Sequence, residues 1–319
     1  MMNADQRLGA SFRDPSGFIF TRQGVLYRQV NRRYQVDYDR LMGSGLYEKL
    51  VEGGRLIAHE ATDELPADPD LAYKVIRPER VRFISYPYEW SFSQLKEAAL
   101  ATLRIQKIAL EMNQTLKDAS AYNIQFQHGK PVLVDTLSFT AYEEGQPWNA
   151  YRQFCQHFLA PLALMAHTDV RLVTLLRSYI DGIPLDLASR LLPKRTRLDF
   201  NLATHIHWHA AAQQRYADQS PEKAKARVHV SRIAFLGLLD SLESAVRKLH
   251  WKPEGTEWGA YYAQHASHYS GEALGHKGEL VGQFIEKAQP KTVWDLGANT
   301  GLFSRLASQR GIDTVAFDI

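Results

Sequence analysis

The sequence contains a single cysteine, Cys155, among its 319 residues. One cysteine can form neither an internal disulfide framework nor a zinc site built from cysteine pairs. Long apolar runs are also missing, because the longest, FLAPLALMA, is far shorter than the about 20 residues that a membrane-spanning helix needs. The polar first residues have no apolar stretch typical of a signal peptide. These absences lead us to expect a cytoplasmic protein with no membrane partner.

The sequence also lacks a concentrated charge of one sign. Its 38 basic and 35 acidic residues are mixed along the chain and leave a formal net charge of +3. A surface that binds nucleic acid needs a more concentrated positive field, so nucleic acid is not an expected partner. Hydrophobic residues make up 45% and charged residues 23%, which are ordinary values for a folded globular protein. A chain of this length is expected to form two domains, or one large domain with an appendage.

Residues 1–90 are expected to form a small, mostly β lobe with one helix. Alternating apolar and polar residues predict two strands around a turn at Arg22-Gln23-Gly24. Helical spacing follows in residues 38–54. Residues 55–61 and 79–86 are interpreted as further strands.

Residues 91–225 are expected to form a mainly helical lobe with one β-hairpin. Ser91 and Gln94 fit a capping box, which predicts the start of a helix that runs to about Asn113. A hairpin is predicted with its turn at His128-Gly129-Lys130. The remainder of the lobe shows helical spacing, and a polar, charged stretch near its end indicates a domain boundary.

The most specific motif lies near the end of the sequence, in residues 291–319. It predicts a strand, a glycine turn, a helix and a second strand that ends in an acid. Gly297 and Gly301 can adopt positive φ and let the backbone approach a ligand closely. Asp318, at the end of the second strand, can accept hydrogen bonds from two ribose hydroxyls. Asp295, at the end of the first strand, would repel a pyrophosphate and suits a ligand that carries an ammonium and a sulfonium.

The pattern Asp295-x-Gly297-x-Asn299-x-Gly301 resembles the first motif of class I S-adenosylmethionine (SAM)-dependent methyltransferases. The resemblance implies that residues 226–319 form the start of a Rossmann-like domain that binds SAM as cofactor. It implies that Asp295, Gly297 and Gly301 line the methionine end of SAM and that Asn299 shapes the loop. Asp318 would then hold the ribose.

Two upstream residues, Tyr269 and Lys277, lie where many such enzymes have a helix that covers the cofactor. Either could contact SAM, and a solvated helix is the alternative. A whole domain of this class needs more strands than the two predicted here. We therefore expect a domain that is incomplete at Ile319, and methyl transfer to a small-molecule or carrier-bound acceptor by the complete protein rather than by this chain alone. No residue is assigned to catalysis of methyl transfer.

The stretches SYPYEWSFSQLKEAALATL, DTLSF and WNAYRQFCQHFLAPLAL resemble a bacterial family usually labelled SAM-dependent methyltransferase or nodulation-protein-like. This resemblance covers most of residues 12–319. It implies a large amino-terminal region fused to a carboxy-terminal methyltransferase domain. The predicted elements add an overall α/β fold class, with an amino-terminal α+β region that could form two lobes like those of a kinase.

A second group of residues lies in the middle of the chain. Asn123 lies five positions after Asp118, and Asp135 follows the predicted hairpin. This spacing resembles the catalytic loop and metal-binding acid of the protein-kinase and aminoglycoside-phosphotransferase superfamily. The resemblance implies that Asp118 is the base of a phosphoryl transfer and that Asn123 and Asp135 hold Mg²⁺ against the phosphates of ATP.

The same region departs from the kinase pattern in several places. It has no glycine-rich phosphate loop, Lys117 replaces the usual histidine or arginine before the acid, and Thr-Leu follows Asp135. Arg28 stands where a lysine is expected, and it receives no role. An active phosphotransferase, an inactive kinase-like fold and an unrelated hairpin therefore stay open. A non-catalytic binding scaffold is a further alternative for the whole amino-terminal region.

Two smaller features are interpreted as structural. His205, His207 and His209 alternate and would share one face of a strand, where they could bind a metal, but the surrounding residues have helical spacing. We expect packed or surface histidines. Cys155 belongs to an apolar helical face and is interpreted as a core residue.

Overall fold

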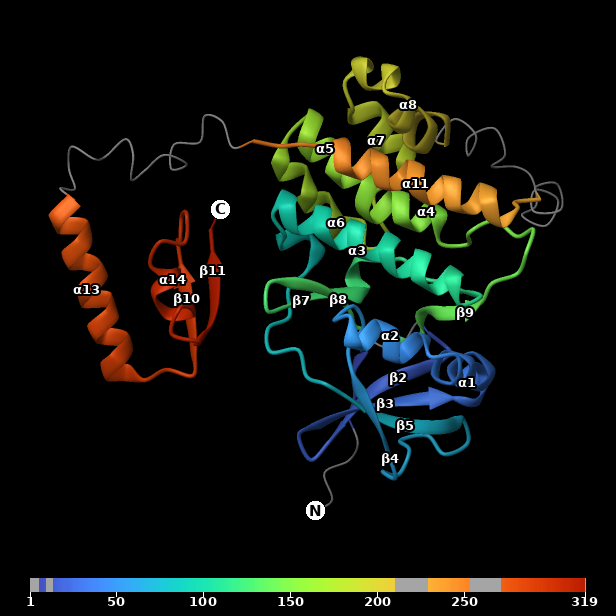
Figure 1. Cartoon of the computed structure of the whole chain (residues 1–319), viewed down its shortest axis with the longest axis horizontal. Helices are drawn as coiled ribbons and strands as arrows, with labels where there is room; N and C mark the ends of the chain where they lie inside the picture. The colour runs from blue at the N-terminus through green and yellow to red at the C-terminus, as the bar shows by residue number, and fades with distance from the viewer. Residues whose placement is uncertain (1–5, 10–13, 210–228, 253–270, 319) are drawn as a thin grey trace. The chain divides into compact units, whose positions relative to one another are not determined.

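A computed structural model describes residues 6–9, 14–209, 229–252 and 271–318. The chain divides into two compact units, residues 1–251 and 252–319, which we call unit 1 and unit 2. Both units contain helices and strands, so the expected mixed α/β class is confirmed (Figure 1).

Unit 1 begins with a five-stranded antiparallel sheet of order β1-β2-β3-β5-β4. The strands are β1 (Gln6–Arg7), β2 (Gly17–Arg22), β3 (Val25–Asn31), β4 (His59–Thr62) and β5 (Ala72–Pro78). The predicted β2–β3 turn is confirmed: Gln23 and Gly24 both have positive φ, 52° and 78°, as a two-residue hairpin turn requires.

The strand predicted over residues 79–86 is wrong, because β5 ends at Pro78 and the next residues form an irregular connection. The backbone of Ser85 has a side-chain partner instead of a neighbouring strand. Its N–H donates to Gln125 Oε1 at 3.0 Å, and its carbonyl accepts from Gln125 Nε2 at 2.9 Å. The alternating pattern of residues 79–86 therefore does not produce a strand.

The helix predicted over residues 38–54 forms as two helices, α1 (Gln35–Gly43) and α2 (Leu46–Glu52). Gly45 separates them with a left-handed φ of 80°, a conformation that glycine adopts at little cost. Leu41, Leu46 and Leu50 are fully buried, so both helices pack against the core despite the break.

The second lobe of unit 1 is built on α3 (Phe92–Glu111). Ser91 and Gln94 form the predicted capping box, with hydrogen bonds of 3.3 and 3.0 Å between side chain and backbone. Two short antiparallel pairs follow: β6 (Gln114–Leu116) pairs with β9 (Phe139–Ala141), and β7 (Ile124–Gln127) pairs with β8 (Lys130–Leu133). The second pair confirms the predicted hairpin, because its turn lies at His128-Gly129.

The remainder of unit 1 is helical and packs on the same large apolar core as α3. Its helices are α4 (Tyr151–Phe154), α5 (Ala160–His167), α6 (Leu175–Ser178), α7 (Leu185–Leu191), α8 (Phe200–Leu202) and α11 (Arg232–Lys248). Two π-helical segments, Cys155–Leu159 and Ala203–Trp208, continue α4 and α8. Turns of 3₁₀ helix lie at Arg32–Tyr34, Pro87–Glu89, Ala121–Asn123, Thr136–Ser138, Val170–Thr174 and Lys194–Leu198. Within the described ranges, no helix is both long and apolar enough to cross a bilayer.

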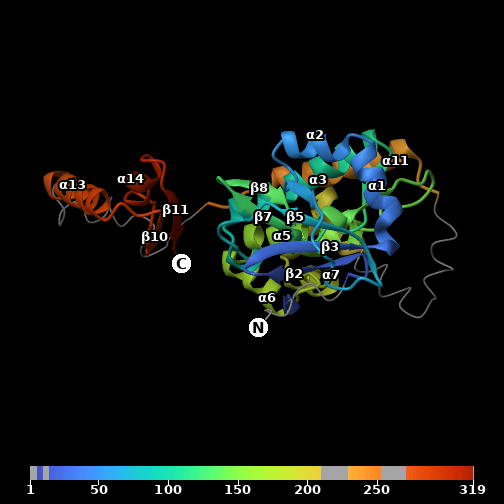
Figure 2. The same cartoon turned by 90° about the horizontal axis from the view of Figure 1, so that it is seen from below.

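Helix α11 lies within the residues 226–319 that the sequence motif assigns to the last domain, yet it packs on α3 in unit 1 (Figures 1 and 2). Lys107 on α3 donates to Asp240 and Glu243 on α11, both at 2.6 Å. Phe235, Leu239 and Leu242 of α11 are buried in the core of unit 1.

Unit 2 contains α13 (Gly271–Ala288), β10 (Thr292–Leu296), α14 (Ser304–Ser308) and β11 (Asp313–Phe317). The two strands are parallel, in register from Thr292↔Asp313 to Leu296↔Phe317. The strand, loop, helix and strand therefore follow the predicted order. Parallel strands joined through a helix place both carboxyl ends at one edge of the sheet.

Candidate functional site

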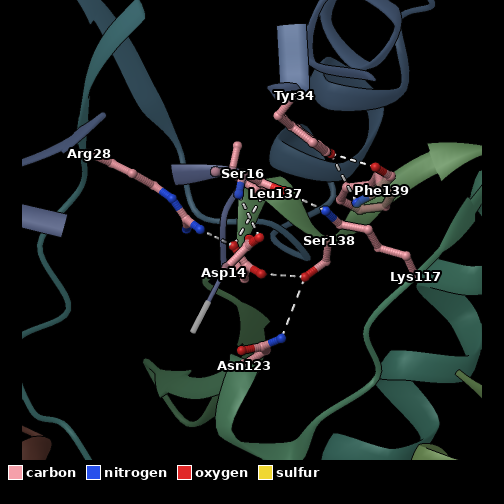
Figure 3. Close-up of polar contacts among 10 residues, drawn as sticks. Asp14, Ser16, Arg28, Tyr34, Lys117, Asn123, Leu137, Ser138 and Phe139 are labelled. Carbon is pink, nitrogen blue, oxygen red and sulfur yellow. Dashed lines mark hydrogen bonds and ion pairs between the residues drawn. The ribbon is translucent and has the colours of Figure 1, made fainter. Parts of the chain in front are cut away.

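Asp118, Asn123 and Asp135 come together in unit 1, where the chain leaves β6 and β8. Ser138 links two of them: its Oγ donates to Asp135 Oδ2 at 2.6 Å and accepts from Asn123 Nδ2 at 3.5 Å (Figure 3). The backbone carbonyl of Asn123 accepts from Val134 N at 2.8 Å, which holds the two loops together. Sequence reasoning missed Ser138, since only its position three residues after Asp135 could have indicated it.

Asp135 is paired with Arg28, a β3 residue without a predicted role. Arg28 Nη2 lies 2.5 Å from Asp135 Oδ1, and the two side chains are only 9% and 15% exposed. Leu137 N also donates to Asp135 Oδ1, at 3.1 Å. Burial alone would raise the pKa of Asp135, but the Arg28 charge and the bonds from Ser138 and Leu137 hold that pKa below its ordinary value. Asp135 is therefore an ionised carboxylate with a cationic partner.

Lys117 links the two lobes of unit 1. Its Nζ donates to Ser16 Oγ at 2.8 Å and lies 4.5 Å from the ring centroid of Tyr34 (Figure 3). The Tyr34 hydroxyl donates to Phe139 O at 2.5 Å, and burial together with the charge of Asp135 raises the pKa of that hydroxyl. Lys117 is thus a contact between the lobes.

The segment before β2, residues 14–16, packs closely against β3 beside these side chains. Ser16 N donates to Asp14 Oδ1 at 2.8 Å, and Ser16 O accepts from Asn31 N at 2.8 Å. A side chain at Gly17 would bring its Cβ within 2.2 Å of Gln29 O and 2.8 Å of Leu137 Cδ1. Only glycine fits at this position without a shift of the backbone.

Asp118 differs from Asp135 in its electrostatics. Burial, with a contribution from the Asp135 charge, raises its pKa, although bonds from Ser120 N–H, Gln153 and Asn123 act in the opposite direction. The Ser120 N–H donates to Asp118 Oδ1 at 2.9 Å. A carboxyl group with a raised pKa next to an ionised one can accept or hold a proton.

The present arrangement of donors does not fit Mg²⁺. Both Asp135 oxygens have donors, from Arg28, Leu137 and Ser138, and the Asn123 amide nitrogen faces Ser138. Across the part of the chain that the structure describes, no group of three His, Cys, Asp or Glu side chains is arranged to hold a metal ion. A metal at Asp135 would first have to displace the Arg28 guanidinium.

The alternating histidines and Cys155 are packed in the protein. His205 bonds to Tyr151 and Ser241 at 2.8 Å through its two ring nitrogens, and His207 bonds to Ser189 at 2.7 Å. Burial lowers the pKa of His205 to about 4. Burial also raises the pKa of Cys155, which keeps it a neutral thiol in the core.

In unit 2, the residues of the glycine motif gather at the carboxyl ends of β10 and β11. Gly297, Asn299 and Gly301 all have positive φ, at 77°, 50° and 73°. The N–H groups of Gly297 and Ala298 both donate to Phe317 O at 2.9 Å. Asn299 N–H donates to Asp318 Oδ2, so the acid after β11 contacts the loop after β10.

Asp295 lies at the same sheet edge and has its own partner. Ser304 Oγ donates to Asp295 Oδ2 at 2.6 Å. A Cβ built on Gly297 would meet no atom within 4 Å among the described residues, so the backbone there leaves room for a ligand. The arrangement offers two carboxylates and exposed backbone at one edge, which fits an ammonium and a ribose.

Of the two upstream candidates for a cofactor contact, the structure describes Lys277 but not Tyr269. Lys277, on α13, has its Nζ 4.6 Å from the ring centroid of Phe303, at the end of the glycine loop. Lys277 is exposed and lies near the motif, which is compatible both with a cofactor contact and with a solvated helix. Tyr269 lies outside the described residues.

The fold and these two groups of residues define a mixed α/β protein with a two-lobed unit and a strand–loop–helix–strand unit. No family model matches the chain. The chain is 32% identical, over 327 aligned positions, to nodulation protein NoeA of Rhizobium meliloti (strain 1021). The alignment covers 98% of this chain and 66% of that relative. This similarity supports a nodulation-protein-like family, in agreement with the sequence resemblance. The relative's name states no reaction.

Proposed function

We propose that the protein takes part in SAM-dependent methyl transfer and that unit 2 contributes the cofactor site. The observation that carries this proposal is the joint position of Asp295, Asp318 and the glycine loop at one edge of a parallel strand pair. Ligands of open α/β sheets bind outside the carboxyl ends of the strands. A carboxylate beside exposed backbone suits the ammonium and sulfonium of SAM better than a pyrophosphate.

Under this proposal each residue has a distinct task. Asp295 receives the ammonium of the methionine end, and Asp318 accepts from the ribose hydroxyls. The loop of Gly297, Asn299 and Gly301 brings the backbone close to the ligand. Lys277, near the end of this loop, makes a further contact with the ligand. SAM supplies an activated methyl group, and the protein's contribution is orientation of that group toward a nucleophile on a small-molecule or carrier-bound acceptor.

Isothermal titration of the full chain with SAM tests the proposal. We expect binding by the wild type and at least a tenfold weaker affinity, about 1.4 kcal/mol, in both Asp295→Ala and Asp318→Ala. Ser308→Ala is the matched control, because Ser308 lies on α14 and its hydroxyl donates to the nearby carbonyl of Arg305. Absence of SAM binding by the wild type would contradict the proposal.

A second candidate function is nucleotide-dependent phosphoryl transfer by unit 1. The observation in its favour is that Asn123 and Asp135 meet at Ser138, with Asp118 bonded to Asn123 beside them, on loops held by the β6–β9 and β7–β8 pairs. Against metal-assisted chemistry stands the Arg28–Asp135 ion pair, which favours an inactive kinase-like region or a binding scaffold.

Titration with ATP in MgCl₂ and in EDTA separates these alternatives. A phosphotransferase is expected to bind ATP only with magnesium, and to lose that binding in Asp135→Ala. An inactive nucleotide-binding region would bind ATP equally in EDTA. A scaffold would bind ATP under neither condition.

A further inference from the structure

Ser304 is buried and forms the 2.6 Å hydrogen bond to Asp295 across the glycine loop of unit 2. Its relative exposure is 7%, and it is the first residue of α14. Asp295 is the last polar residue of β10, paired with Ala316 of β11. The hydroxyl of Ser304 thus reaches from the helix that follows the loop to the carboxylate that precedes it.

A hydrogen bond of this length to a carboxylate restricts how that carboxylate rotates. Hydrogen bonds to charged groups are short and stronger than neutral ones. One Asp295 oxygen, Oδ2, is held by the hydroxyl, which sets the plane in which the other oxygen can meet a ligand. The start of the helix is held to the loop beside the serine, because Arg305 N–H donates to Gly301 O at 3.1 Å.

We propose that Ser304 is a positioning residue that orients Asp295 toward the ammonium group at the amino-acid end of the cofactor. This inference rests on the proposed function, because it needs a ligand with such a group at Asp295. It adds a residue outside the glycine motif to the site. Ser304 acts through Asp295 and does not itself contact the ligand.

The test compares two probes, SAM and 5′-methylthioadenosine, which lacks the amino-acid end of SAM but keeps the adenosine and sulfur. The full chain is titrated with each probe as wild type, Ser304→Ala, Ser304→Thr and the control Ser308→Ala. We expect Ser304→Ala to weaken SAM binding about tenfold and to leave methylthioadenosine binding unchanged. Ser304→Thr keeps a hydroxyl and should retain most of the SAM affinity.

The outcomes separate this inference from the proposed function. If the wild type binds SAM and Ser304→Ala binds it equally well, the positioning role is wrong while the cofactor site stands. If Ser304→Ala weakens both probes alike, Ser304 only stabilises the loop, and the inference is again wrong. If the wild type binds no SAM, the proposed function itself fails, and this inference fails with it. Thermal unfolding of each variant confirms that the chain is folded during the titrations.

Discussion

At the residue scale, the Arg28–Asp135 ion pair joins the two lobes of unit 1 at a buried position. Both charges are removed from water, so each depends on the other for compensation. The Arg77–Glu60 ion pair, by contrast, lies in solvent, with side chains that are 52% and 70% exposed. Because one pair is buried and the other is exposed, we expect their removal to change the free energy of unfolding by very different amounts.

Removing one member of the buried pair is expected to destabilise unit 1 strongly. Arg28→Ala leaves the Asp135 carboxylate buried without its cation, which should lower the free energy of unfolding by ~3–5 kcal/mol in urea titrations. Arg77→Ala, the exposed control, should cost no more than about 1 kcal/mol. The double variant Arg28→Met/Asp135→Leu should recover part of the loss, because no charge remains buried. Equal losses in Arg28→Ala and Arg77→Ala would contradict this account.

At the element scale, features set by neighbouring residues could be predicted from the sequence. The capping box at Ser91 and the turns at Gln23-Gly24 and His128-Gly129 depend on local chemistry, and all three are present. The strand over residues 79–86 could not be excluded in advance, because its partner is the side chain of Gln125, far along the chain. Likewise, residues 38–54 have a continuous helical pattern, which does not indicate the break at Gly45.

The same distinction between neighbouring and distant partners applies to the residues of the candidate sites. Asp295 and Asp318 share an edge because parallel strands dictate it, and the spacing of Asp118, Asn123 and Asp135 indicated their meeting. The partners of these carboxylates could not be predicted. Arg28 reaches Asp135 only when the small sheet closes on the second lobe, and Ser304 reaches Asp295 only after the loop has turned.

At the scale of the whole molecule, buried neutral histidines make the stability of unit 1 depend on pH. His59, His157 and His205 each have a pKa lowered from 6.5 to about 4, chiefly by burial. The unfolded chain takes up protons near pH 6.5, whereas the folded chain takes them up only near pH 4. The contribution of these neutral rings to the free energy of unfolding is therefore fully present above about pH 6.5, and it is lost as the pH decreases toward 4.

This dependence can be measured as the free energy of unfolding in urea at pH 7.5 and pH 5. We expect a lower value at pH 5, since each unit of lowered pKa corresponds to ~1.4 kcal/mol. Asp118, with its raised pKa, acts in the opposite direction. His205→Gln should flatten the profile. Equal stability at the two pH values would show that these rings are not buried as neutral groups.

Helix α11 has a consequence for the order in which the protein is made. Lys96, near the start of α3, donates to the carbonyls of Arg247 and Leu249 at 2.9 and 2.7 Å, and these residues follow much later in the chain. On the ribosome, α3 emerges long before its cover does. The part of α3 that packs against α11 is therefore covered only after residues up to Leu249 have left the exit tunnel.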